Sequence, residues 1–231
     1  MSIDVTLASL IDSLLAGERV AVERWPVEVG PPEDWGFSQG PHGISLPGPI
    51  EALHGGSIRE HMTQRAASWT RSLEIHSAIS STSDRLLVLA DRESVNGVVC
   101  LAEMQTRGRG RRGRSWLTPL GGNLALSAGF AIRRELADLG GLSLVVGLAL
   151  LDALEALGFE SLALKWPNDL LLGGAKLGGI LIELKATAAD QAATEAIVGV
   201  GINLRLSAQA RAAIDQQVTD LSAAGAEVAR N

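Results

Sequence analysis

The spacing of apolar residues along the chain predicts a fold that mixes helices and strands. Three segments carry apolar side chains at helical spacing and are predicted helices: residues 6–15, 80–90 and 139–157. Six segments in which apolar residues alternate or run continuously are predicted strands: residues 97–104, 123–130, 162–166, 170–172, 176–184 and 196–204. Gly158 ends the longest helix, and Gly173-Gly174 suits a two-residue hairpin turn. Because hairpins and a long helix both join these strands, we expect an α+β fold, a mixed β-sheet with helices on one side.

The first part of the chain is rich in residues that interrupt helices and strands. Five prolines and five glycines lie between residues 25 and 48, which leaves room for little more than a short hairpin over residues 36–46. Residues 50–61 are expected to return to helix, and a linker is expected near residues 63–67. We therefore divide the chain into a small N-terminal region, residues 1–64, and a main domain, residues 65–231.

Composition narrows the class of protein by exclusion. A chain of 231 residues with 46% hydrophobic residues can bury a real core, which excludes disorder as its main state. Its net charge of −6 disfavours general binding to nucleic acid. Asp4, Asp12 and Glu18 interrupt the start of the chain, and Asp152 and Glu155 interrupt the longest predicted helix, so we expect no membrane span, no signal peptide and a cytoplasmic location. The single cysteine, Cys100, excludes an internal disulfide and a cysteine-based metal cluster.

Residues 105–116 (QTRGRGRRGRSW) concentrate arginine and glycine in one loop. Glycine lets the backbone approach an anion closely, and guanidinium groups form planar hydrogen bonds to phosphate or carboxylate. The three glycines also satisfy the spacing G-x-G-x-x-G, but Trp116 and Pro119 follow where a dinucleotide-binding fold needs a helix, so we reject that fold. From composition alone, a solvated loop or a nonspecific nucleic-acid patch remains an equal alternative to a phosphate site.

A second block, residues 165–183 (KWPNDLLLGGAKLGGILIE), joins a strand end to a hairpin. Taken singly, Asn168-Asp169 is ordinary turn chemistry and Lys165 an ordinary solvated residue. Lys176 is more informative, because it begins an apolar strand where a lysine can bind phosphoryl or carboxylate oxygens. The glycines of residues 198–204 (VGVGINL) admit a ligand or, as the simpler interpretation, a tightly packed neighbour.

In combination, these blocks and SSTSDRLL at residues 80–87 resemble the successive motifs of biotin protein ligases, in the same order. The resemblance covers about residues 71–206 and implies a fold related to class II aminoacyl-tRNA synthetases and lipoate ligases. It implies a two-step reaction in which biotin and ATP form biotinyl-5′-AMP. A lysine of the biotin carboxyl carrier protein of acetyl-CoA carboxylase, or of a related carboxylase, then takes the biotinyl group. ATP and biotin are therefore expected substrates, with Mg²⁺ screening the phosphates.

The resemblance also implies roles for individual residues. Lys176, Arg109 and Asp169 are the implied catalytic residues. The residues implied to bind biotin are Ser81, Thr82, Ser83, Gln105, Gly108, Arg109, Gly110, Arg111, Lys176 and Gly179. Those implied to bind the nucleotide are Arg111, Arg112, Arg114, Trp116, Lys165, Asn168 and Asn203, although Trp116 could instead brace the loop. No direct metal cluster is implied: phosphates would hold Mg²⁺, with Asp169 as a candidate ligand.

The chain departs from the family pattern in several places. Ser83 stands where the family commonly has asparagine. Residues 7–22 and 35–58 resemble parts of a degenerate winged helix, but the residues between Arg24 and Trp35 are too few and too rich in proline for a recognition helix, so we expect no DNA binding. After Asn231 the family would continue with a helix and an SH3-like barrel, so we expect a truncated C-terminal part.

Two alternative functions stay open: a lipoate-type ligase, and a paralogue that binds biotin or biotinyl-AMP without transfer. Homodimers through sheet edges are also expected from the family.

Overall fold

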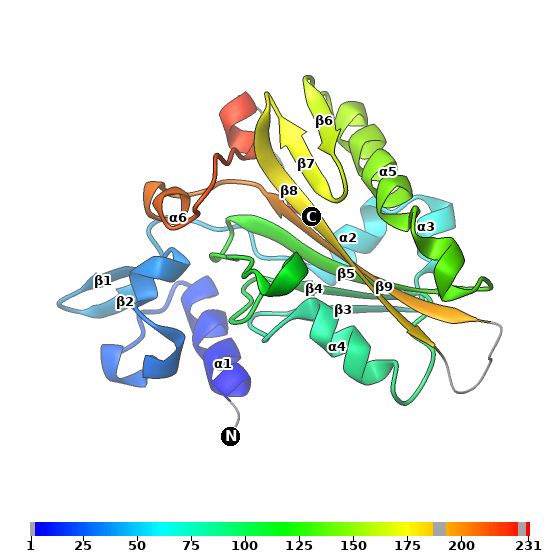
Figure 1. Ribbon diagram of the computed structural model, residues 1–231. Coiled ribbons are helices and arrows are strands. Elements are labelled where there is room, and N and C mark those ends of the chain that lie inside the picture. Colours follow the sequence, from blue (N-terminus) through cyan, green and yellow to red (C-terminus); the bar gives the residue numbers. More distant parts are fainter. Residues whose placement is uncertain (1–2, 187–192, 226–229) are drawn as a thin grey trace.

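The structure is a computed structural model that describes residues 3–186, 193–225 and 230–231. Figure 1 shows a large twisted sheet with helices around it and a small N-terminal region at one end. The α-helices are α1 (Ile3–Leu15), α2 (Gly55–His61), α3 (Gln64–Trp69), α4 (Thr82–Leu89), α5 (Leu142–Ala156) and α6 (Ala208–Ala212). The strands are β1 (Ser38–Gly40), β2 (Gly43–Ser45), β3 (Ser72–His76), β4 (Val98–Ala102), β5 (Asn123–Ile132), β6 (Leu162–Lys165), β7 (Asp169–Leu172), β8 (Ala175–Ala186) and β9 (Thr194–Asn203).

The large sheet has seven strands in the order β3-β4-β5-β9-β8-β7-β6. Strands β3 and β4 are parallel, and the other neighbours are antiparallel. The predicted α+β class with a mixed sheet is therefore confirmed. Gly173 and Gly174 both have positive φ, 58° and 84°, at the turn between β7 and β8, as the two-residue hairpin requires. Gly158, at φ 89°, follows the end of α5 as predicted.

Helices cover both faces of this sheet, so the expectation of helices on one side is wrong. The alternation of β4 separates two packed layers: Val98 and Cys100 meet Leu86 of α4, whereas Val99 and Leu101 belong to a cluster with residues from the α2–α3 side. In Figure 1, α4 lies in front of the sheet and α2 and α3 lie behind it. Helix α5 packs on the same face as α2 and α3, over β6, β7 and β8. All five residues of β4 are buried, as expected for an apolar strand that is covered on both faces.

The N-terminal region shares its apolar core with the main domain. Its core residues on α1 are Leu7, Leu10, Ile11 and Leu14. They pack with the β1–β2 hairpin and also with Ala78, Met104 and Leu120 of the main domain. Residues 22–35 form three short 3-10 turns, Val22–Arg24, Val27–Val29 and Pro32–Trp35. The core of the N-terminal region therefore includes Met104, the residue that directly precedes Gln105.

Three local expectations differ from the structure. The helix predicted over residues 50–61 begins only at Gly55, because residues 50–54 run alongside the main domain. The predicted linker near residues 63–67 lies in α3, for which the Thr63 hydroxyl accepts a hydrogen bond from the Ala66 amide as N-cap. Strand β3 is absent from the predicted strands, although its five residues, SLEIH, alternate polar and apolar side chains as a half-buried strand does.

A buried ion pair between Glu103 and Arg230 joins two parts of the chain that are distant in sequence. The Glu103 carboxylate is 2% exposed and accepts hydrogen bonds from the Leu53 amide and from Arg230 Nη2, the latter at 2.6 Å. Asn231 Oδ1 also accepts a hydrogen bond from the His54 amide at 2.6 Å. Residues 230–231 therefore lie against residues 51–54 and cover the end of β4.

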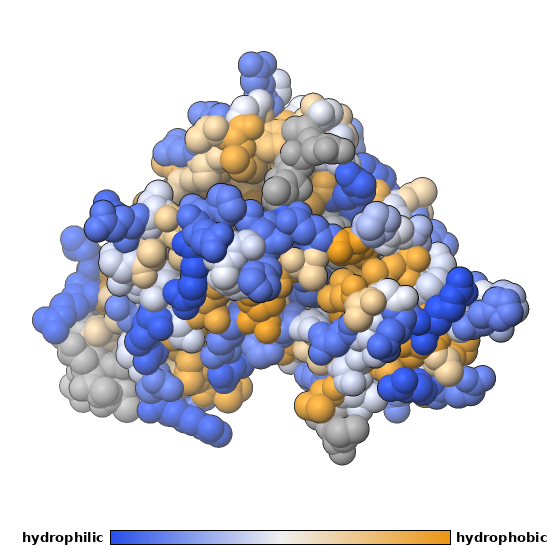
Figure 2. Space-filling view, turned by 180° about the vertical axis from the view of Figure 1, so that it is seen from behind, coloured by the Kyte–Doolittle hydropathy of each residue, from blue (hydrophilic) through white to orange (hydrophobic). Residues whose placement is uncertain are grey.

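The outer surface of α5 is unusually apolar. Leu144, Val145 and Leu148 are between 40% and 63% exposed. Among the described residues, the segment Leu136–Ala156 is long and apolar enough to cross a membrane by length and composition alone. It contains a 3-10 turn before α5, and Leu154 of α5 packs into the sheet core. The face of the molecule shown in Figure 2 carries several apolar patches separated by hydrophilic residues.

Candidate active site

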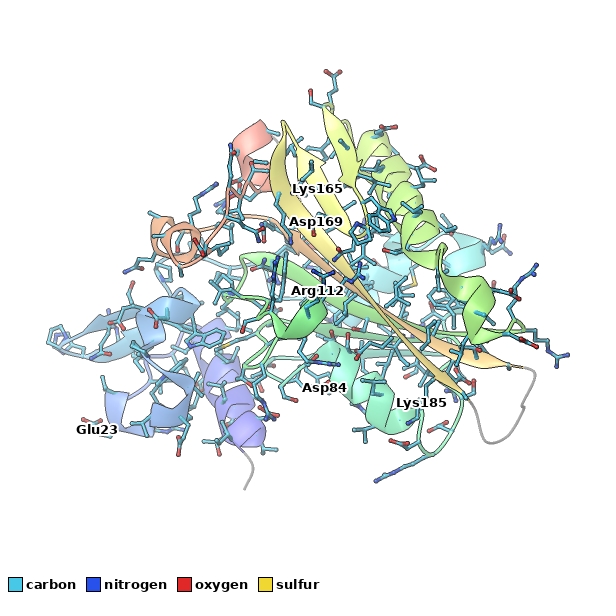
Figure 3. All side chains as sticks on the ribbon, viewed as in Figure 1. Glu23, Asp84, Arg112, Lys165, Asp169 and Lys185 are labelled. Carbon is cyan, nitrogen blue, oxygen red and sulfur yellow. The ribbon has the colours of Figure 1, made fainter. Side chains whose placement is uncertain are left out.

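A pocket of about 360 Å³ lies where the N-terminus of α4, the Arg/Gly loop (residues 105–116) and the β6–β7 turn meet. In Figure 3, Lys165 and Asp169 lie above Arg112, and Asp84 of α4 lies below it. The predicted site residues that line this pocket are Ser81, Thr82, Ser83, Gln105, Arg109, Gly110, Arg111, Arg112, Arg114, Trp116, Lys165, Asn168, Asp169, Lys176 and Gly179. The other two, Gly108 and Asn203, line an adjoining cavity of about 1030 Å³ that shares Lys176 and Trp116 with the first.

Lys176 and Asp169 form an ion pair inside this pocket. Lys176 Nζ lies 2.9 Å from Asp169 Oδ1, and their side chains are only 15% and 21% exposed. Two backbone hydrogen bonds fix Lys176: its amide donates to the Gln217 carbonyl, and its carbonyl accepts from the Thr219 amide. The ammonium group also lies 5.9 Å from the centre of a Trp116 ring. Lys176 is therefore a partly buried cation at the junction of the two cavities.

Trp116 packs on the sheet at a position of β9 where only glycine leaves enough room. Its indole lies directly on Gly201 of β9, where an added Cβ would come within 2.4 Å of Trp116 Cε2. The Trp116 amide donates to the Gly108 carbonyl at 2.8 Å, which folds the Arg/Gly loop back on itself. Its indole Nε1 is buried and has no hydrogen-bond partner within the described residues. Gly201 therefore leaves room for the tryptophan of the loop on the sheet surface.

Arg109 is bound by two carboxylates. Its Nη2 lies 2.7 Å from Asp84 Oδ1 on α4 and 2.6 Å from Glu183 Oε2 on β8. Partial burial acts to lower the pKa of the Arg109 guanidinium, but the hydrogen bond to Glu183 and the charges of both carboxylates outweigh it and raise the pKa above its ordinary value. The Arg/Gly loop is thus tied to α4 and β8 through one side chain.

A chain of buried polar side chains forms one wall of the pocket. Gln105 Oε1 accepts from the Thr82 amide at 2.8 Å and from Thr82 Oγ1 at 3.1 Å, and Gln105 Nε2 donates to Thr118 Oγ1 at 3.1 Å. Ser127 Oγ lies 2.8 Å from Thr82 Oγ1 and 3.0 Å from Ser83 Oγ. Each of these five residues is at most 5% exposed. The wall is therefore rigid and polar, and water reaches little of it.

The turn after β6 is held firmly, yet it exposes a tryptophan. Asn168 Nδ2 donates to the Ile180 carbonyl, and the Ile180 amide donates to the Asn168 carbonyl. Ser143 Oγ donates to the Pro167 carbonyl at 2.6 Å. Trp166, between these fixed points, is 75% exposed at the rim of the pocket. The Asn168 amide group therefore has a structural role here, since its hydrogen bond goes to β8.

The described residues contain one group with metal-ligand side chains in close proximity. Single ligand atoms of Glu74, His76 and Cys100 lie within 4.8 Å of one another, on β3 and β4. Arg85 already donates two hydrogen bonds to the Glu74 carboxylate. Burial, with the Glu74 charge as a second cause, raises the pKa of the Cys100 thiol to about 12. This group therefore presents an ion-paired carboxylate and a protonated thiol.

Sequence reasoning missed four residues around the pocket: Asp84, Glu183, Thr118 and Ser127. Asp84 and Glu183 lie inside quoted motifs, but nothing local indicates that both reach the same arginine. Thr118 and Ser127 lie outside those motifs, and only the fold brings them against Gln105 and Thr82. A buried serine in the apolar run of β5 was the only available signal.

Comparison with known proteins gives a consistent result. The family model of the biotin/lipoate A/B protein ligase family matches residues 76–203. The bifunctional ligase/repressor BirA of Salmonella typhimurium is 35% identical over 245 aligned residues, covering 99% of this chain and 73% of that protein. The biotin–[acetyl-CoA-carboxylase] ligase of Mycobacterium tuberculosis is 36% identical, covering 71% of this chain and 60% of that protein. The solved structure of biotin protein ligase from Aquifex aeolicus in complex with biotin and ATP is 31% identical with a TM-score of 0.54, covering 69% of this chain and 64% of that chain.

Proposed function

Because the chain belongs to the biotin/lipoate A/B protein ligase family, we propose that it uses ATP to attach biotin to a lysine of a carrier protein. The observation that carries this proposal is the partly buried Lys176–Asp169 pair, which lies in a pocket lined by the Arg/Gly loop. The tuberculosis relative is named for acetyl-CoA carboxylase, so we propose the biotin carboxyl carrier protein of that or a related carboxylase as the acceptor.

In the first step, a biotin carboxylate oxygen attacks the α-phosphorus of ATP, and pyrophosphate leaves. Two anions must approach each other, so positive charge has to lie where they meet. Lys176 would supply this charge, and Arg111, Arg112 and Arg114, which are exposed and line the pocket, would bind the phosphates. Mg²⁺ would be held by the phosphates and the Asp169 carboxylate, whose oxygen suits this ion, and would neutralise charge on the triphosphate.

In the second step, the neutral ε-amine of the carrier lysine attacks the carbonyl carbon of the mixed anhydride. The carbonyl–oxygen bond to phosphate breaks, AMP leaves, and the amine proton passes to solvent. Lys176 can stabilise the negative charge that develops on the carbonyl oxygen. The Arg/Gly loop, tied down by Arg109, would keep water from the anhydride before the carrier arrives.

The test incubates the purified chain with ATP, Mg²⁺, biotin and an apo carrier domain, and follows carrier mass together with pyrophosphate release. We expect one biotinyl group per carrier, and a loss of at least about 100-fold in both readouts for Lys176→Ala. The matched control is Lys185→Ala, since Lys185 lies on the same strand but pairs with Asp91 outside the pocket. Pyrophosphate release without transfer would leave an adenylating protein, and no activity in either assay would contradict the proposal. Parallel assays with lipoate test the related ligase.

The remaining properties are also proposals. The 3-10 turns of residues 22–35 support the absence of operator binding, which a gel-shift assay tests. Strand β8 runs to Ala186, whereas its pairing with β7 ends at Gly179, and this open edge supports a homodimer that sedimentation would detect. A cytoplasmic location fits the proposed carrier and is tested by cell fractionation.

A further inference from the structure

The polar wall of the pocket has a fixed direction of hydrogen bonding. The Thr82 backbone amide can only donate, so the group that it meets at 2.8 Å must be the Gln105 carbonyl oxygen. The Gln105 amide nitrogen must then face Thr118 and donate to it. The Thr82 backbone amide thus determines which end of the Gln105 side-chain amide carries the oxygen, although the two ends have nearly the same shape.

The hydroxyl hydrogens follow from this orientation. Gln105 Oε1 only accepts, so the Thr82 hydroxyl donates to it. With its one hydrogen used, Thr82 Oγ1 must accept from Ser127 at 2.8 Å. Ser127 in turn has no hydrogen left, so Ser83 donates to it at 3.0 Å. Every hydroxyl hydrogen from Ser83 to Gln105 is therefore committed within the wall.

The groups that remain for a ligand have a defined polarity. Thr82 and Ser83 keep unused oxygen lone pairs, and Gln105 keeps one unused N–H; all three residues line the pocket. A ligand with two N–H donors beside one carbonyl acceptor matches this set, and a cyclic urea has that pattern. Gly199 leaves space for the Ser83 oxygen, since a Cβ there would lie 2.7 Å from it.

We propose that Thr118 and Ser127, fully buried and outside the pocket lining, are positioning residues that maintain this polarity and so help the pocket to select a ureido ligand. Thr118 binds one Gln105 N–H, and Ser127 takes the Ser83 hydrogen. This inference rests on the proposed function, because biotin supplies the urea. Ser83 offers only an acceptor to a ligand in this network, because its hydrogen goes to Ser127. The polarity that the ligand meets therefore depends on the Thr82 amide together with two hydroxyl groups that lie outside the pocket lining.

Isothermal titration calorimetry tests the proposal on the full chain with biotin and with the two biotin analogues in which either ureido N–H is replaced by oxygen. Ser127→Ala frees the Ser83 hydrogen, so we expect biotin to bind about 3- to 10-fold more weakly while one analogue gains relative to biotin by a similar factor. A structural role would weaken all three ligands alike. That uniform loss, or an unchanged ratio of dissociation constants, would overturn the proposal.

Thr118 provides an independent arm with a rescue variant. Thr118→Val keeps the shape but removes the acceptor of the Gln105 amide, and we expect about 3- to 10-fold weaker biotin binding. Thr118→Ser retains the hydroxyl and should bind within about 2-fold of the wild type. Thr70→Val is the matched control, since Thr70 is also buried and donates to the Ala66 carbonyl far from the pocket. Equal affinity of Thr118→Val and wild type would refute the role of Thr118. A wild-type chain that binds no biotin would instead refute the proposed function.

Discussion

Neutralising the two carboxylates that hold Arg109 should release the Arg/Gly loop. The perturbation is the double variant Asp84→Asn with Glu183→Gln, which keeps side-chain shape and removes both charges. Each ion pair is short, at 2.7 and 2.6 Å, but the Arg109 side chain is 38% exposed, so solvent weakens both. Pairs of this kind contribute about 0.2–1 kcal/mol each. Their joint loss of about 0.4–2 kcal/mol should raise the population of the open loop by about 2- to 30-fold.

Limited proteolysis measures this population directly, because the loop carries five arginines between residues 107 and 114 where trypsin cleaves. When closure is fast, the cleavage rate follows the fraction of open loop. The site of cleavage is identified by mass, and cuts elsewhere in the chain serve as an internal reference. Asp91→Asn is the control, since Asp91 pairs with Lys185 and not with the loop. A double variant cleaved in the loop at the wild-type rate would refute the idea that these pairs hold the loop closed.

Three further predictions concern the core and the sheet surface. Cys100 is buried with a thiol pKa raised to about 12, so at pH 8 it should react with a disulfide reagent about 1000-fold more slowly than a free thiol until urea unfolds the chain; rapid labelling of the native protein would contradict this. Gly201→Ala places a Cβ against the Trp116 indole and should lower the free energy of unfolding by about 1–3 kcal/mol in urea titrations; an unchanged value would show that the indole moves freely. Burial raises the pKa of Glu74, but its bonds to Arg85 and His76 lower it more, giving a net pKa below the ordinary 4.5. This stabilisation is present above pH 4.5 and lost as the pH falls through the lowered pKa, so Arg85→Gln should flatten that acid loss in thermal melts, and parallel curves for the two proteins would contradict the assignment.

The sequence predicted what local chemistry decides. Gly158 and Gly173-Gly174 mark their helix end and hairpin because only glycine adopts these positive φ angles easily, and the structure has both. The placement of helices on both faces depends instead on long-range packing, which the pattern of β4 indicates only once its neighbours are known. Residues 50–54 are extended because their backbone is used by Glu103 and Asn231, partners that no local window contains.

The candidate site shows the same limit. Motif blocks predicted the lining residues, since each block is contiguous in sequence, and the fold brings nearly all of them to one pocket. The partners of those residues could not be predicted, because Arg109 and Glu183 are 74 positions apart. The roles of the lining residues stay predictions until the assays above are done.

The pairing of Glu103 with Arg230 has a consequence for synthesis on the ribosome. Arg230 follows Glu103 by 127 residues, so at about 5–20 residues per second it is made about 6–25 s later. Until then the Glu103 carboxylate lacks the cation that pairs with it in the folded protein, and burying the carboxylate unpaired would be costly. Leu53, whose amide also donates to Glu103, must wait with it, so the apolar surface of β4 that Leu53 covers at Val99 and Leu101 stays open until Arg230 is made. Residues 51–54 are therefore made early but are among the last to reach their final positions.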